Sequence, residues 1–108
     1  MNLEIWKSGL EASSTVRQLV YQGRDRHLAA FRKDVPRVVA KLSRQRAGTP
    51  GALHGCRLEI EASGGVRLTA SAQSARLSAA VERAFRDAAG KLRAHAANPV
   101  ATFEHAPA

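Results

Sequence analysis

Polar and hydrophobic residues alternate in four segments of the chain, as they do in a strand that has one buried and one exposed face. These segments are residues 1–6, 37–44, 54–62 and 66–73. The third segment alternates most regularly, and Ser63-Gly64-Gly65, between the third and the fourth, is typical of a tight hairpin. The pattern therefore predicts four strands, of which a hairpin joins the last two.

Two longer segments have hydrophobic residues every three or four positions, which is the repeat of a helix with one buried face. The first covers residues 14–33 and begins with Thr15 and Gln18 at the spacing of a capping box. Its apolar face comprises Val16, Leu19, Val20, Gly23, His27, Ala30 and Phe31. We expect Gly23 to allow a close approach to the sheet beneath the helix.

The second helical segment covers residues 75–95, with Ser74 as the expected N-cap. Its apolar stripe comprises Leu77, Ala80, Val81, Ala84, Phe85, Ala88 and Leu92. The first helix is expected to end at Asp34-Val35-Pro36, because a residue before proline is disfavoured in a helix. The alternative, a helix that continues to Arg44 in place of the second strand, would place Pro36 inside the helix.

The resulting order is strand, helix, three strands and helix, which predicts an α+β fold with a single four-stranded sheet in β-α-β-β-β-α order. The helical crossover makes the first two strands parallel neighbours, and the other strands are expected to be antiparallel. Each strand has one apolar face, so both helices are expected to cover one face of the sheet. The opposite face, open to water, carries Lys41, Arg57, Glu59, Glu61 and Arg67.

The composition adds a strong positive charge to this picture. The 108 residues suit one domain, expected over residues 1–96, with a disordered tail at 97–108. The chain has 17 Lys and Arg against 9 Asp and Glu, a formal net charge of +8, so a polyanion such as a nucleic acid is the expected partner. No stretch reaches the roughly 18 apolar residues that span a bilayer, and the N-terminus does not resemble a signal peptide. We therefore expect a cytoplasmic protein that does not contact a membrane.

The sequence offers little for catalysis or metal binding. The single cysteine, Cys56, cannot form an intramolecular disulfide and alternates inward as a core residue. His54 is expected on the same face, but neither a third catalytic group nor further metal ligands accompany the pair. No phosphate-binding glycine loop or nucleophile elbow is present. We expect no enzymatic activity, no metal, no cofactor and no small-molecule substrate.

The basic residues of the two helical segments avoid the apolar stripes and form the predicted RNA-binding surface. They are Arg17, Arg24, Arg32, Lys33, Arg76, Arg83, Arg86, Lys91 and Arg93. Tyr21 and Leu28 are expected on the same arc as the arginines of the first helix. Adjacent helices would present these charges together to RNA phosphates, and a surface that is merely solvated is the alternative. We expect Trp6, on the open face of the first strand, to cover an edge or loop, with stacking on a base as the alternative.

Several strings of residues resemble the hibernation-promoting factor family, also called ribosome-associated inhibitor or sigma-54 modulation proteins. They are residues 1–5 (MNLEI), 38–43 (VVAKLS), 55–60 (GCRLEI), 64–68 (GGVRL) and 79–84 (AAVERA). The first four resemble the family's strands, and the last resembles the start of its final helix. The resemblance extends over residues 1–95, and the short tail after Ala96 is similar to the short class of the family.

This resemblance implies a cytoplasmic protein that binds rRNA of the small ribosomal subunit. Family members occupy the channel for mRNA and tRNA and silence translation in resting or stressed cells, so the expected function is translation inhibition by a monomer, with a dimer as the alternative. Two other functions stay open. One is a family paralogue that binds proteins instead of ribosomes, which Asp87 and Gly90 within the basic stretch favour. The other is a general double-stranded RNA-binding domain, whose helix–three-strand–helix core is similar.

Overall fold

Strands and helices account for most of the residues that the structure, a computed structural model, describes: 1–10, 13–46 and 52–97. In chain order they are β1 (Asn2–Ser8), α1 (Ser14–His27), the 3-10 helix η1 (Ala29–Phe31), β2 (Arg37–Arg46), β3 (Ala52–Ala62), the 3-10 turn η2 (Ser63–Gly65), β4 (Val66–Ser74) and α2 (Leu77–Ala97). The predicted strands and helices are all present, in the predicted order. Within these residues, no helix combines the length and the apolar character needed to cross a membrane.

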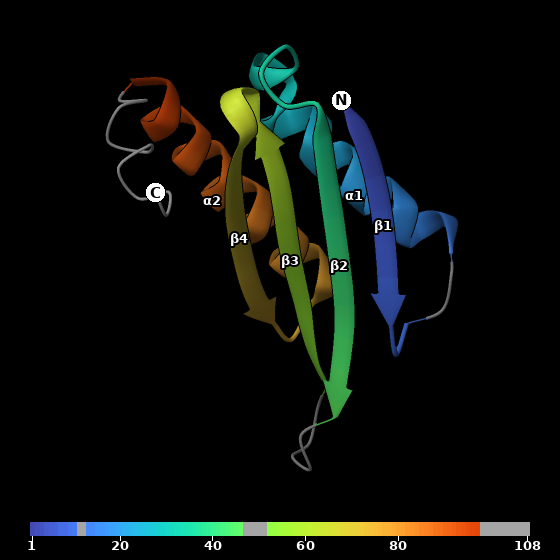
Figure 1. The fold of residues 1–108 in the computed structure, drawn as a ribbon. Coiled ribbons are helices and arrows are strands. Elements are labelled where there is room, and N and C mark those ends of the chain that lie inside the picture. Colours follow the sequence, from blue (N-terminus) through green and yellow to red (C-terminus); the bar gives the residue numbers. More distant parts are fainter. Residues whose placement is uncertain (11–12, 47–51, 98–108) are drawn as a thin grey trace.

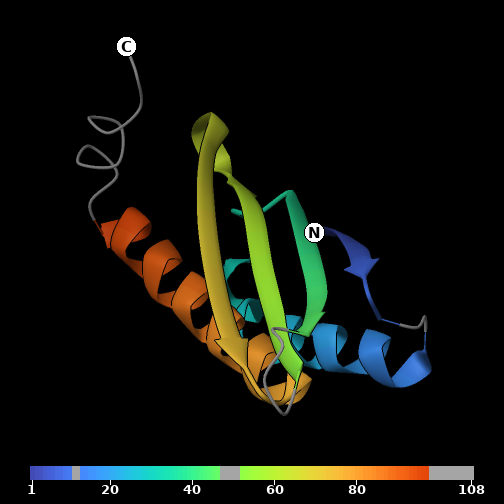
Figure 2. The same cartoon turned by 90° about the horizontal axis from the view of Figure 1, so that it is seen from below.

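The strands of the described residues form one four-stranded sheet in the order β1-β2-β3-β4. β1 is parallel to β2, and β3 is antiparallel to both of its neighbours. α1 and α2 both lie on one side of this sheet (Figure 1, Figure 2). The predicted α+β fold is therefore confirmed. The alternative helix through Arg44 is wrong, because β2 begins directly after Pro36.

The hydrophobic core fills the space between the sheet and the helices. Successive strand residues point to opposite faces, so the sheet side of the core consists of the inward residues of the strands. Helical residues share a face every 3.6 positions, so α2 contributes the predicted apolar stripe. The buried members on these elements include Val38, Ala40, Leu42, Cys56, Leu58, Ile60, Ala70, Ala80, Val81, Ala84, Phe85, Ala88 and Leu92. Polar residues are left on the other face of the sheet, which no described element covers.

The structure corrects the prediction for α1 at both ends. The N-cap is Ser13, whose side-chain oxygen accepts a 3.1 Å hydrogen bond from the backbone N–H of Val16, whereas Thr15 of the predicted capping box lies inside the helix. α1 stops at His27, and η1 then winds with about three residues per turn. This change of pitch buries Leu28 completely and exposes Ala30, the reverse of the prediction for both residues.

α2 also begins and ends differently from the prediction. Ser74 belongs to β4 and accepts a 3.3 Å hydrogen bond from the N–H of Arg76, so it precedes the N-cap position instead of occupying it. The carbonyl of Arg76 accepts a helical hydrogen bond from Ala80 at 3.1 Å. The helix extends to Ala97, and the rest of the predicted tail lies outside the described residues.

Glycines explain one turn and one close contact. Gly64 and Gly65 have φ angles of 82° and 76°, in the left-handed region that favours glycine, and they form the predicted hairpin between β3 and β4. Gly23 is buried, but its close approach is to α2 and not to the sheet. A Cβ atom at Gly23 would lie 2.5 Å from Cδ2 of Phe85.

Candidate nucleic-acid interface

The predicted RNA-binding residues lie on α1 and α2 or next to them. Arg17 and Arg24 are on α1, Arg32 and Lys33 follow η1, and Arg76 immediately precedes α2, which carries the other four. Arg24 is half-buried, and the rest are exposed. The fold therefore presents all of these cations from the helical layer.

Six of these residues line three shallow hollows on the described surface. The hollows have volumes of about 220, 340 and 480 Å³. They are lined respectively by Arg24 with Arg32, by Arg76 with Arg26, and by Arg83, Arg86 and Lys91. The second hollow lies between α1 and α2, so the structure does bring basic residues of the two helices together there. Arg17, Lys33 and Arg93 line none of the three.

Carboxylates neutralise part of this positive surface. Arg24 pairs with Asp25 at 3.0 Å, Arg86 with Glu82 at 3.7 Å, and Lys91 with Asp87 at 3.5 Å. Lys91 also donates a 2.6 Å hydrogen bond to the carbonyl of Thr69, which directs its ammonium group toward the edge strand β4. The predicted cations with no carboxylate within 4.0 Å, as far as the described residues go, are Arg17, Arg32, Lys33, Arg76, Arg83 and Arg93.

Glu82 links the two helices, and the sequence did not indicate this role. Its carboxylate lies 2.8 Å from Nε2 of His27 and 3.3 Å from Nη1 of Arg26, both on α1. Burial raises the pKa of Glu82, but the hydrogen bond with His27 and the charges of His27, Arg26 and Arg86 outweigh that effect, so the pKa is lowered. The sequence indicates only that Glu82 can pair with Arg86, because the two residues are four positions apart on one helix.

The open face of the sheet is a second polar surface, with both signs of charge. Lys41 and Arg57 lie 3.1 and 3.8 Å from the carboxylate of Glu59, as expected of neighbouring strand residues. Glu61 lies 3.9 Å from Arg37, which also makes two 2.9 Å hydrogen bonds to Glu4. The sheet face is therefore partly neutralised as well.

Aromatic side chains accompany the cations on both surfaces. The guanidinium of Arg24 lies 5.1 Å from the ring centroid of Tyr21 on α1. On the open face, Nζ of Lys41 lies 5.3 Å from the ring centroid of Trp6, and 56% of the surface of Trp6 is exposed. An aromatic ring with a cation near one face is suited to nucleic acid, because a base can stack on the ring while the phosphate pairs with the cation.

The structure confirms Cys56 as a core residue. It is 2% exposed, and burial raises the pKa of its thiol to about 12, so the thiolate does not form at neutral pH. Nδ1 of His54 lies 3.1 Å from the carbonyl oxygen of Ala75. Within the described residues, no group of three or more His, Cys, Asp or Glu side chains is placed to hold a metal ion.

No model of a known protein family matches the sequence, and no curated protein sequence matches it. Solved structures do share the fold. A ribosomal subunit interface protein from Coxiella burnetii superposes with a TM-score of 0.76 at 14% identity, over 90% of this chain and 99% of that one. The N-terminal domain of Thermus thermophilus Protein Y gives a TM-score of 0.67 at 22% identity, over 87% of this chain and 98% of that one.

These similarities are in the fold. Both neighbours are members of the hibernation-promoting factor family, which the strings of residues in this chain resemble. The likeness extends over nearly the whole length of each neighbour. The fold that the resemblance implied is therefore observed.

Proposed function

We propose that this protein acts as a member of the hibernation-promoting factor family and binds rRNA of the small ribosomal subunit. In this proposal it silences translation in the cytoplasm of resting cells by occupying the channel for mRNA and tRNA. One observation carries the proposal: α1 and α2 lie side by side on one face of a fold shared with a ribosomal subunit interface protein, and both expose arginines. The nine cations predicted from the sequence are the proposed contacts with rRNA phosphates.

The six cations without a described carboxylate partner carry most of this interaction in the proposal. Arg86, Lys91 and Arg24 each lie near a carboxylate, so an incoming phosphate would have to compete with an existing ion pair. Arg83 is exposed and lines the same hollow as Arg86, without such a competitor in the described structure. We therefore assign Arg83 a larger share of the binding free energy than Arg86.

Sedimentation with purified small subunits over a salt series tests the proposal. We expect the protein to pellet with the subunits at low salt and to dissociate steeply as salt rises, because bound cations release counterions from the RNA. R83A should weaken binding and reduce the slope of log affinity against log salt by about one. R67A, which removes an arginine that is also exposed but lies on the sheet face, is the matched control and should leave binding unchanged.

Failure to pellet at low salt would overturn the proposal. The ion pairs that neutralise Arg86 and Lys91 would then favour the alternative, a related fold that binds a protein partner. Release of the bound protein by an arbitrary RNA duplex would instead indicate a general double-stranded RNA-binding domain. Translation assays with the same variants test the silencing step, since R83A should inhibit less than R67A does.

A further inference from the structure

The strand register divides the open face of the sheet into a half that contains all of its carboxylates and a half that contains none. Trp6, Lys41, Arg57 and Ser71 are paired in one row across all four strands. The next row toward the ends of β1 and β2 is Ser8, Ser43, Gly55 and Gln73. The carboxylates of this face, Glu4, Glu59 and Glu61, belong to the two rows on the other side. Each half of the face has two cations, Lys41 and Arg57 in one and Arg37 and Arg67 in the other, but only the half with Trp6 has no carboxylate.

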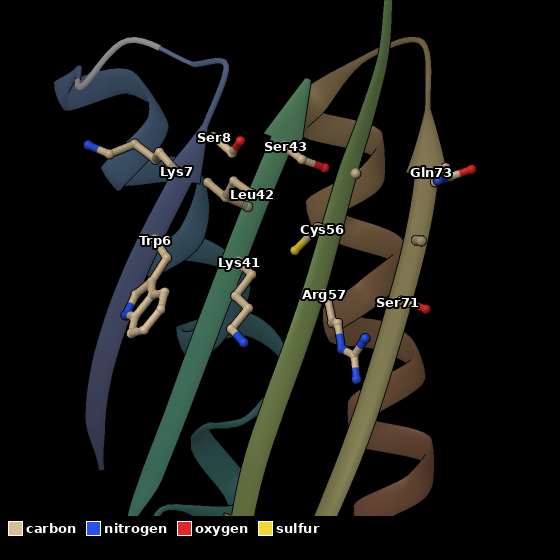
Figure 3. Close-up of a pocket in the computed structure, with 12 residues that line it drawn as sticks. Trp6, Lys7, Ser8, Lys41, Leu42, Ser43, Cys56, Arg57, Ser71 and Gln73 are labelled. Atoms are coloured by element: carbon tan, nitrogen blue, oxygen red, sulfur yellow. The ribbon is translucent and has the colours of Figure 1, made fainter. Parts of the chain in front are cut away.

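A hollow of about 670 Å³ lies over these two rows, and none of the described residues that line it is acidic (Figure 3). Gly55 helps to form its floor, because a Cβ at this position would lie 2.7 Å from Oγ of Ser43. The absence of a side chain at Gly55 thus leaves the Ser43 hydroxyl in place and keeps the middle of the hollow open. Figure 3 shows Trp6 at one side and Arg57 toward the other, with Lys41 between them.

Neighbouring carboxylates balance the positive charge in this hollow only in part. Lys41 and Arg57 lie 3.1 and 3.8 Å from Glu59, and among the described residues this one carboxylate serves both cations. The two cations therefore share one negative charge, while the indole N–H of the exposed Trp6 donates a 3.4 Å hydrogen bond to Glu4, which also pairs with Arg37. A flat ring next to surplus positive charge, with hydroxyl and amide groups nearby, suits a base attached to a phosphate.

We propose that this hollow binds a single-stranded RNA segment, with a base stacked on Trp6 and the adjacent phosphate held by Lys41 and Arg57. Ser8, Ser43, Ser71 and Gln73 supply hydrogen bonds to ribose or base edges. The hollow lies over two rows of the open face, and both helices lie on the other side of the sheet (Figure 2), so this site is separate from the proposed rRNA surface and does not depend on it. The protein would then hold structured RNA on its helical side and a single strand on its sheet side.

The single tryptophan of the chain makes the site directly observable. We expect a hexauridylate to quench Trp6 fluorescence at low salt, with quenching that weakens as salt rises. Fluorescence anisotropy of the labelled hexauridylate should show a loss of about tenfold in affinity for W6A, with most of the affinity retained in W6F. K41A and R57A should each weaken binding by roughly threefold to tenfold.

R67A is the matched control, because Arg67 is an exposed cation of the same face that does not line the hollow, and it should bind hexauridylate like the wild type. Melting temperatures close to that of the wild type would exclude unfolding as the cause of a loss. R83A should retain hexauridylate binding, and K41A should still pellet with ribosomal subunits, so the two proposals can fail separately.

Three results would overturn the site: no quenching at low salt, an equal loss of affinity in R67A and K41A, or equal competition by an oligoglutamate peptide of the same length. The last result would show that the hollow recognises negative charge and not nucleotides.

Discussion

Gly23 of α1 lies directly against the ring of Phe85 of α2, and a Cβ on the glycine would come within 2.5 Å of the ring. Phe85 is completely buried, so its ring has no free space into which it could turn away. The contact therefore sets how closely the two helices pack. Since both helices carry the proposed rRNA contacts, this one glycine also sets the spacing of their cations.

Replacement of Gly23 by alanine should destabilise the protein. Overpacking costs about 1–3 kcal/mol, and the better helix propensity of alanine returns about 1 kcal/mol of that. Urea denaturation measures the difference. G90A is the matched control, because a Cβ at Gly90 meets no atom within 4 Å, and this variant should gain about 1 kcal/mol. Equal effects of G23A and G90A would contradict this account of the helix contact.

Replacement of Ser13 by alanine should cost about 1 kcal/mol of unfolding free energy, because the N–H of Val16 loses its hydrogen-bond acceptor. T15A tests the capping box predicted from the sequence, and it should change stability much less since Thr15 lies inside α1. Thermal or urea unfolding of S13A and T15A decides whether Ser13 or Thr15 caps the helix. A larger loss of unfolding free energy for T15A than for S13A would show that Thr15 is the N-cap.

Glu82 should make the stability of the protein sensitive to acid. Its pKa is lowered in the folded state from the ordinary 4.5, so its ionised form contributes stability above that value, and this contribution is lost as the pH falls through the folded pKa. Urea unfolding at a series of acidic pH values should therefore show a smaller loss of stability for E82Q than for the wild type. Identical pH profiles would contradict the role of this carboxylate.

An NMR titration can test the cause of the shift at Glu82. The H27A variant removes the 2.8 Å contact that helps to lower the pKa, so the carboxyl should titrate at a higher pH than in the wild type. An unchanged titration midpoint would show that Arg26 and Arg86 suffice to lower the pKa of Glu82.

The Cys56 thiol should react very slowly in the native protein. Burial raises its pKa from 9.0 to about 12, which lowers the thiolate fraction at pH 8 by about a thousandfold. An aromatic disulfide reagent followed by absorbance measures the rate, with the urea-unfolded protein as the control. Fast labelling under native conditions would contradict the burial of this residue.

The order and type of the elements were predictable from the sequence because they depend on neighbouring residues. Alternation placed Leu58 and Ile60 inward, a helical repeat identified the stripe that includes Phe85, and Pro36 separated α1 from β2. The predictions failed where helices begin and end. The cap at Ser13 depends on one hydrogen bond, and the burial of Leu28 depends on a change of helical pitch. The residue pattern does not specify either feature, because many sequences are compatible with a helix end one or two residues away.

The candidate surfaces were predictable only as a set of cations. Their charge and their separation from the apolar stripes are properties of the sequence, and so is the single apolar face of each strand. The carboxylates that pair with Arg24, Arg86 and Lys91 are one or four positions away on the same helix. The contact that brings Arg26 and His27 to Glu82 instead joins two helices. A sequence does not indicate such contacts, because residues 55 positions apart meet only once the core has oriented both helices.

The sequence by itself determined the fold, the positive charge and the inward face of each element, because local periodicity and sterics act within a few residues. The tertiary structure decided which side chains share a surface. Strand register put Trp6, Lys41 and Arg57 in one row, and helix packing put Gly23 against Phe85. Both relationships depend on how distant segments align, and this alignment is set by the packing of the whole core.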